Sequence, residues 1–181
     1  IPEDLSVYTD ETVGTLNAAV EAVVRDLPAS QQDVVDDYAE AIEDAIAKLA
    51  YKPADYTAVD AAIEKAEALD GSLYANFSAV TEAVNAVEEG KNITEQETVD
   101  GYAAAIEAAL DALVLRGDMD RGGTVDIQDV MAACRVLARS NAGDAATDDE
   151  LLTGDLDGNG AIDIQDIMEI CRILARQAMA Q

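Results

Sequence analysis

The sequence predicts an all-α protein in which helical repeats are followed by a duplicated acidic loop and helix. Apolar residues recur at intervals of three and four through residues 8–114, which is the period of an amphipathic helix. Residues 9–50 repeat the pattern of residues 73–114 at an offset of 64, and residues 117–139 return as residues 154–176. Fourteen of these last twenty-three paired positions are identical, which indicates two copies of one structural unit.

The predicted domain 53–115 contains three amphipathic helices joined by short loops. Its last helix, residues 95–115, carries an apolar stripe made of Val99, Tyr102, Ile106, Leu110 and Leu113. Thr94, followed three residues later by Glu97, matches a capping box at the start of this helix. Because short connections favour antiparallel neighbours, we expect an antiparallel three-helix bundle.

Residues 1–52 carry only the last two of these helices. Their apolar positions correspond to those of the complete domain, as in the pairs Val35 and Val99, Tyr38 and Tyr102, and Ile42 and Ile106. We therefore expect residues 1–52 to be the C-terminal part of a preceding copy, separated from the complete copy by Pro53.

The composition argues against several classes of function. The chain has no histidine, which removes histidine-based catalysis and histidine-ligated zinc, and no other nucleophile has a base beside it. A formal net charge of −27 argues against nucleic acid as a partner. No run of eighteen apolar residues occurs, so membrane insertion is not expected.

Residues 154–176, GDLDGNGAIDIQDIMEICRILAR, begin with oxygen-bearing side chains at alternate positions. A twelve-residue calcium loop supplies its ligands from positions one, three, five, seven, nine and twelve. Here these positions are Asp155, Asp157, Asn159, the carbonyl of Ala161, Asp163 and Asp166. Gly160 stands at the sixth position, where the chain turns with a positive φ. The loop ends in aspartate where the general pattern has glutamate.

The first copy, GDMDRGGTVDIQDVMAACRVLAR, has the same spacing. Its ligand positions are Asp118, Asp120, the carbonyl of Thr124, Asp126 and Asp129. Its fifth position is Gly122, which has no side-chain oxygen. We therefore predict two Ca²⁺ ions, of which the second loop binds its ion more tightly.

Residues 117–177 resemble a type I dockerin, a duplicated calcium-binding module whose two loops both end in aspartate. The resemblance implies an EF-hand-like loop and helix in each of two copies. It also implies that residues 116–181 dock a secreted enzyme to a cohesin module of a scaffold or of another enzyme, in either of two orientations. The implied partner contacts are Ile127, Gln128, Cys134, Arg135 and Arg139, with Ile164, Gln165, Cys171, Arg172 and Arg176.

The helical repeats resemble FIVAR modules, which occur as spacers beside dockerins in large secreted carbohydrate-active enzymes. The stretches YANFSAVTEAVNAV and KNITEQETVDGYAAAIEAAL carry this likeness. It implies a secreted or cell-surface location and a spacer function for residues 1–115. It also implies a non-catalytic fragment whose parent protein is a glycoside hydrolase.

Three further expectations concern the duplicated unit. The side chains of Val130, Met131, Leu137, Ile167, Met168 and Leu174 are expected in its core. Cys134 and Cys171 are compatible with a disulfide or with two free thiols. Thr147 and Glu150 match a capping box for one short helix before the second loop.

The alternative function is an EF-hand-like calcium sensor or buffer. Such a protein needs a helix before each loop as well as after it. Residues 144–154, which precede the second loop, are too short and too polar for a full helix of this kind.

Overall fold

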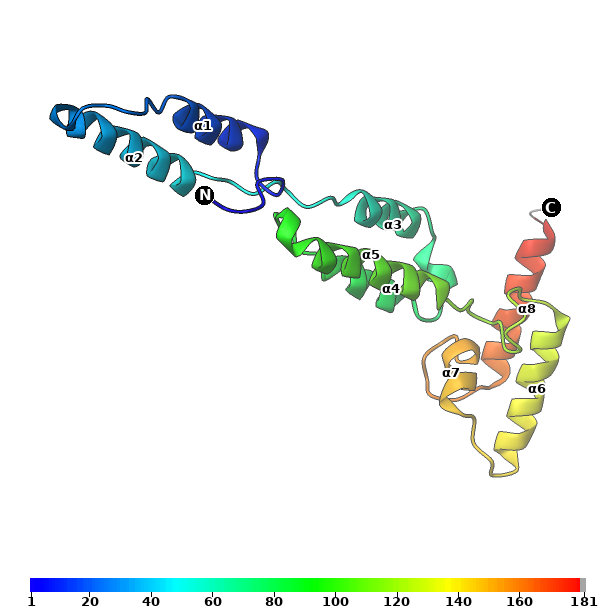
Figure 1. Cartoon of the computed structure of the whole chain (residues 1–181). Coiled ribbons are helices and arrows are strands. Elements are labelled where there is room, and N and C mark those ends of the chain that lie inside the picture. Colours follow the sequence, from blue (N-terminus) through cyan, green and yellow to red (C-terminus); the bar gives the residue numbers. More distant parts are fainter. Residues whose placement is uncertain (180–181) are drawn as a thin grey trace. The chain divides into compact units, whose positions relative to one another are not determined.

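Residues 1–179 are described by the computed structural model and contain eight α-helices and no β-strand (Figure 1). The protein is therefore all-α, as predicted. Its contacts divide the chain into two units, residues 1–58 with 88–101 and residues 59–87 with 102–181. The predicted boundaries 1–52, 53–115 and 116–181 follow the sequence repeats instead, and they stay a prediction.

The first unit contains the helices α1 (Asp10–Glu21) and α2 (Gln32–Ala47), which follow one another through the short 3-10 helix η1 (Ala29–Gln31). Thr9 N–H donates to the carbonyl of Ala50 at 2.8 Å, so the start of α1 lies beside the end of α2 and the pair is antiparallel. Leu16 and Ala45 are buried within this pair. The rings of Tyr8 and Tyr51 stack at its base, with centroids 4.7 Å apart.

The predicted cap at Thr94 is wrong. Residues Ile93–Glu95 form the 3-10 helix η3, and α5 runs from Gln96 to Asp111. Asn92 is the capping residue, because its Oδ1 accepts from Thr94 N–H at 3.0 Å while Glu95 accepts from Asn92 N–H at 3.2 Å. The Thr94 hydroxyl itself donates to Asn92 Oδ1 at 2.6 Å, and asparagine is the stronger N-cap residue of the two.

The second unit contains α3 (Thr57–Glu67) from residue 59 onward, the 3-10 helix η2 (Gly71–Leu73) and α4 (Phe77–Asn85). It also contains α5 from residue 102 onward, whereas the first turns of α5 belong to the first unit. Lys65 of α3 pairs with Glu107 of α5 at 2.9 Å. Asn76, just before α4, donates to the carbonyl of Ala112, just after α5, at 2.7 Å. These three helices bury the following apolar side chains of the unit: Val59, Ala62, Ala66, Val80, Ala103 and Ile106.

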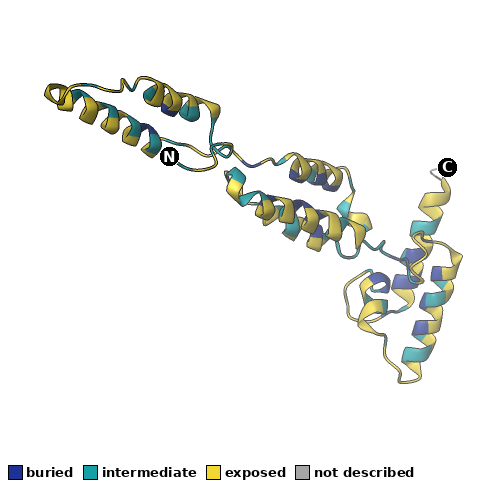
Figure 2. Cartoon of the chain, viewed as in Figure 1, coloured by how far each residue is buried: buried dark blue, intermediate teal, exposed yellow. Residues whose placement is uncertain are grey.

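The same unit contains α6 (Ile127–Asn141), α7 (Asp148–Gly154) and α8 (Ile164–Met179). One core joins them, and its buried members are Val125, Ala133, Val136, Ile162, Ile167 and Ile170. Val125 and Ile162 stand at the eighth position of their loops, so the two copies contribute equivalent residues to this core. The dark-blue stretches of α6 and α8 in Figure 2 mark it.

The short segment between α5 and the first acidic loop, residues 112–116, is held by hydrogen bonds. Arg116 N–H donates to the carbonyl of Leu73 at 2.9 Å, and its guanidinium donates to the carbonyl of Leu156. Gly117 N–H donates to the carbonyl of Thr153 at 2.8 Å.

None of the helices within residues 1–179 combines the length and the apolar character needed to cross a bilayer.

Candidate metal sites and exposed helix faces

The first acidic loop brings three carboxylates together. Asp118, Asp120 and Asp129 each offer an oxygen, and these oxygens all lie within 4.8 Å of one another. Asp118 is 3% exposed and Asp129 is 0% exposed, whereas Asp120 is open to solvent. The cluster therefore concentrates negative charge on two buried carboxylates and one exposed carboxylate.

Backbone N–H groups aim these carboxylates inward. Gly122 and Gly123 donate to the two oxygens of Asp118, both at 2.9 Å. Met119 N–H donates to Asp129 Oδ1 at 2.8 Å, and Asp126 N–H donates to its Oδ2 at 2.7 Å. Because Asp129 lies in the first turn of α6, these bonds fix the loop to the helix that follows it.

The second loop repeats this geometry. Asp155, Asp157 and Asp166 form the matching group within 4.8 Å, and Asp166 is 1% exposed. Leu156 N–H donates to Asp166 Oδ1 at 2.8 Å, the same bond that Met119 makes in the first loop. Gly160 has the positive φ predicted for the sixth position, at 87°.

The remaining predicted ligands lie outside these groups of three. Asp126 and Asp163 accept from Gln128 N–H and Gln165 N–H, both at 2.6 Å, so each caps the first turn of the following helix. Asn159 Oδ1 accepts from Ala161 N–H at 2.9 Å. Thr124 and Ala161, whose carbonyls are the predicted ligands at position seven, are both exposed.

The donor set suits a hard divalent cation. All side-chain atoms that could bind the cation are oxygens. Among the described residues, no lysine or arginine forms an ion pair with either group of three aspartates. Buried carboxylates normally have a compensating charge. Ca²⁺ accepts six to eight oxygens in a flexible arrangement, which fits three clustered carboxylates with further oxygens at the rim.

An apolar strip lies exposed on each of the two long helices of the duplicated unit. On α6, Ile127 is 57% exposed and Met131 is 41% exposed. On α8, Ile164 is 60% exposed and Met168 is 45% exposed. The expectation that both methionines lie in the core is wrong, because they follow the exposed isoleucines by four residues and therefore share their helix face.

The other core expectations are borne out in most positions. Ile167 is buried, Val130 and Leu137 pack against the core, and Leu174 is half-buried. Both cysteines, Cys134 and Cys171, are free and exposed, and they extend the two apolar strips by a further turn.

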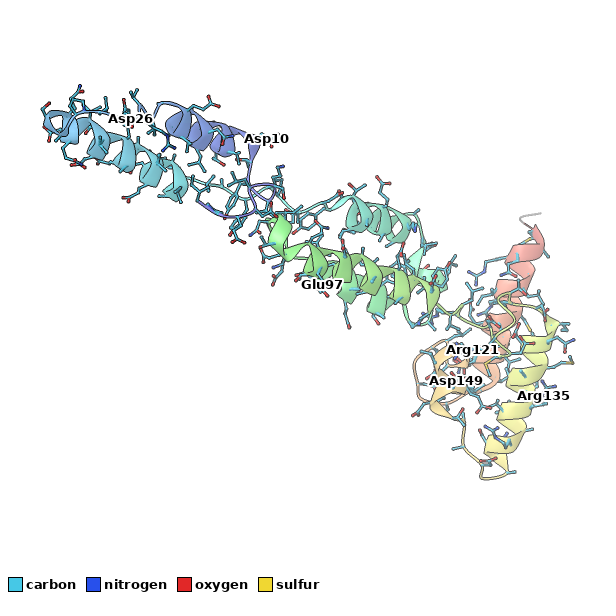
Figure 3. The ribbon with its side chains drawn as sticks, in the orientation of Figure 1. Asp10, Asp26, Glu97, Arg121, Arg135 and Asp149 are labelled. Atoms are coloured by element: carbon cyan, nitrogen blue, oxygen red, sulfur yellow. The ribbon has the colours of Figure 1, made fainter. Side chains whose placement is uncertain are left out.

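A polar strip runs beside each apolar strip. It contains the exposed residues Gln128 and Arg135 on α6, and Gln165, Arg172 and Arg176 on α8. Arg135, labelled in Figure 3, forms no ion pair among the described residues. Arg172 donates to Glu169 at 2.8 Å, and Arg176 pairs with the other oxygen of the same carboxylate.

Arg139 differs from its counterpart Arg176. Its guanidinium donates to Glu150 and lies 3.2 Å from a carboxylate oxygen of Asp144. The hydrogen bond from Arg139 lowers the pKa of Glu150 from 4.5 to about 2, and the Thr147 N–H adds to this effect. Thr147 caps α7 as predicted, so Arg139 ties the end of α6 to the start of α7.

Arg121 was not predicted to have a role in the site. This residue has a φ of 61°, at the loop position where the second copy has Gly158. Its side chain forms an ion pair with Asp149 in the first turn of α7, and Figure 3 labels both residues. The alignment of Arg121 with a glycine of the second copy could have predicted its backbone conformation, because a loop position occupied by glycine often has a positive φ.

Replacing Glu150 by glutamine is expected to destabilise the duplicated unit at pH 7. Because the folded-state pKa of Glu150 is lowered, its contribution is fully present above about pH 4.5 and is lost as the pH falls through about 2. The difference in melting temperature between wild type and Glu150→Gln should therefore shrink between these values. Glu89→Gln, at an exposed position, is the control; a difference that is constant with pH would contradict this role for Glu150.

Comparison of the chain with protein-family models, with curated proteins and with solved structures gave no match.

Proposed function

We propose that residues 116–181 form a calcium-dependent docking module that binds a cohesin module. The observation that carries this proposal is the double repetition: two loops with the same carboxylate geometry each lead into a helix with the same exposed strips. An isolated acidic turn has no reason to recur together with an exposed apolar face. Resemblance to type I dockerins supplies the identity of the partner.

Two Ca²⁺ ions are the proposed cofactors. The first loop would hold its ion with Asp118, Asp120, Asp126, Asp129 and the carbonyl of Thr124; the second with Asp155, Asp157, Asn159, Asp163, Asp166 and the carbonyl of Ala161. The ion supplies positive charge that offsets the repulsion among these carboxylates. Through Asp129 and Asp166, the closed loops orient α6 and α8, because each carboxylate lies in the first turn of its helix.

The proposed contact surface combines the apolar and polar strips of either helix. Exposed isoleucine and methionine side chains offer apolar area that a partner can bury, and the exposed arginines Arg135, Arg172 and Arg176 offer charge-assisted hydrogen bonds to its carboxylates. The approximate equivalence of the strips supports docking in two orientations. Arg139 is the weakest of the proposed contacts, because its guanidinium pairs with both Glu150 and Asp144 and its side chain is less exposed than those of Arg172 and Arg176.

The role proposed for residues 1–115 is that of a FIVAR-like helical spacer, with residues 53–115 as a three-helix bundle. The burial of Val59, Val80 and Ile106 by three successive helices supports this assignment. The module is proposed to be non-catalytic and extracellular, as part of a secreted glycoside hydrolase or related carbohydrate-active enzyme.

An EF-hand-like sensor or buffer is less well supported. The helix before the second loop, α7, has only seven residues, and α5 ends at Asp111, seven positions before the first ligand Asp118. A sensor opens by moving an entering helix against an exiting helix. Among the described residues, no helix ends directly before the first loop, and α7, which ends directly before the second, is too short to be a full entering helix.

A pull-down against candidate cohesins, with calcium and with chelator, tests the proposed function. Binding in calcium that disappears in chelator, and returns when calcium is restored, is the expected result. Calcium binding without capture by any cohesin would favour the sensor or buffer instead.

The change Gly122→Asp is expected to strengthen calcium binding by the first loop by about tenfold, since it adds an anionic ligand at position five. A Cβ on Gly122 would lie 2.8 Å from Asp120 Oδ1, but that atom ends a side chain that can turn toward the ion. Calorimetry should show two unequal sites in the wild type and a tighter first site in the variant.

Gly122→Ala provides the matched control, because it adds the Cβ without an oxygen. Equal affinities of the two wild-type sites, or no gain from Gly122→Asp over Gly122→Ala, would contradict the assignment of position five.

A further inference from the structure

The second acidic loop is braced by a residue that precedes the first loop. Arg116 stands just before Gly117 and Asp118, at the start of the first copy, yet its guanidinium donates to the carbonyl of Leu156 in the second loop. Arg116 is half-buried. In a chain with a formal net charge of −27, this charged donor is committed to a neutral carbonyl. The hydrogen bond therefore ties the start of one copy to the loop of the other.

The Leu156 carbonyl belongs to a peptide group that also holds a proposed calcium ligand. The N–H of this peptide is that of Asp157, and it donates to Asp166 Oδ1 at 3.3 Å. The preceding N–H, that of Leu156 itself, donates to the same oxygen at 2.8 Å. Because a peptide group is planar, a bond that fixes its carbonyl also fixes the direction of its N–H. Arg116 thus acts on Asp166 through this one peptide.

The environment of Asp166 makes this indirect contact matter. The residue is 1% exposed, so water is poorly placed to replace a hydrogen bond that its carboxylate loses. Hydrogen bonds in a chain polarise one another, and a bond from a charged donor is stronger than one from a neutral donor. A guanidinium on the carbonyl of the peptide therefore makes its N–H a better donor to the buried carboxylate.

The first loop lacks this brace. Its equivalent peptide joins Met119 and Asp120, and the Asp120 N–H donates to Asp129 Oδ1 at 3.1 Å. The residue equivalent to Arg116 is Thr153, whose hydroxyl donates to Met119 Sδ at 3.7 Å. A thioether is a weak acceptor, and this contact leaves the peptide carbonyl untouched. The two loops therefore differ outside their ligand sets as well as within them.

We propose that Arg116 is a positioning residue for calcium in the second loop. This role rests on the proposed calcium binding and adds a residue outside the predicted ligands. Arg116 holds the peptide between Leu156 and Asp157. That peptide in turn orients Asp166 toward the ion. Outer partners of metal ligands contribute to metal affinity although they do not touch the metal. The higher affinity predicted for the second loop thus has a cause besides Asn159.

Charge alone would have the opposite effect. A guanidinium near a calcium site repels the ion, so removal of the charge would strengthen binding if nothing else changed. Removal of the brace should weaken binding instead. The change Arg116→Met keeps much of the aliphatic side chain and removes both the charge and the donors. The direction of the change in affinity therefore separates positioning from a charge effect.

A calcium titration of the whole chain, with free calcium set by a chelator, tests this role. Amide NMR signals of Gly123 and Gly160 report the two loops separately, because these N–H groups donate to Asp118 and Asp155. Arg116→Met is expected to weaken the second site by about threefold to tenfold. Arg116→Lys, which keeps a charged donor, should retain most of the affinity. An unchanged or tighter second site in Arg116→Met overturns the proposal.

A second readout, at saturating calcium, separates positioning from a general loss of stability. With both loops filled, hydrogen exchange of the Asp157 amide should be at least about threefold faster in Arg116→Met, while the equivalent Asp120 amide should be unaffected. Ile173→Val trims a side chain that packs against the shared core, and this control should affect both amides alike. Equal acceleration of both amides in Arg116→Met would make Arg116 a structural residue only and overturn the proposal.

Failure of the proposed calcium binding would give a different result. If calcium changes neither the Gly123 signal nor the Gly160 signal of the wild type, the proposed cofactors are wrong, and the role of Arg116 is wrong with them. If the wild type binds calcium in both loops and Arg116→Met binds it equally well in the second, only the role of Arg116 is overturned.

Discussion

Removal of calcium is expected to unfold residues 117–177 and to leave the helices of residues 1–115 folded. Three carboxylates lie within 4.8 Å in each loop, and Asp118, Asp129 and Asp166 are almost fully buried. Without a cation these charges repel one another and stay desolvated, so binding free energy becomes folding free energy. At a calcium concentration of 1,000 times Kd, each site adds about 4 kcal/mol, a large share of the stability of a small module.

Thermal melts followed by circular dichroism, in calcium and in chelator, measure this effect. Calcium should add or raise one transition and leave the transition of residues 1–115 unchanged. The double variant Asp129→Asn with Asp166→Asn is the control, and it should melt alike in both conditions. A transition of residues 117–177 that persists unchanged in chelator would contradict the prediction.

Replacing the exposed residues of both helix faces is expected to abolish cohesin binding, whereas replacing those of one face should leave affinity within about twofold. The pairs are Ile127 with Gln128 and Ile164 with Gln165, each changed to alanine. Loss of one of two equivalent orientations costs only RT ln 2, about 0.4 kcal/mol. Loss of the apolar anchor in both orientations costs about 2 kcal/mol or more.

The exposed methionines allow a larger part of each face to be removed in the same experiment. Met131 and Met168 share the exposed faces of Ile127 and Ile164, so including Met131→Ala and Met168→Ala should not alter the pattern of results. Leu152→Ala on α7 is the control, since Leu152 is 42% exposed but lies outside both strips. Calorimetry in calcium measures affinity, and circular dichroism confirms folding. If one face alone carries most of the affinity, the module docks in a single orientation.

The all-α fold and the two acidic loops could be predicted because both depend on spacing along the chain. A period of three and four residues places apolar side chains on one side of any helix, whatever that helix packs against. The loop pattern is equally local: Asp129 and Asp166 are held by N–H groups within ten positions of themselves in the sequence. Both features could therefore be predicted without knowledge of the tertiary contacts.

Other features depend on contacts between residues that are distant in the sequence, and these contacts could not be predicted from spacing along the chain. Met131 is exposed because the core of α6 and α8 is filled by Ala133, Val136 and their counterparts, so no partner is left for its face. Arg139 and Arg176 occupy equivalent positions, yet Glu150 on α7 binds the first and Glu169 on α8 itself binds the second. A duplicated sequence determines equivalent helices, but each side chain interacts with whichever neighbours the fold places beside it, and here these neighbours are not duplicated.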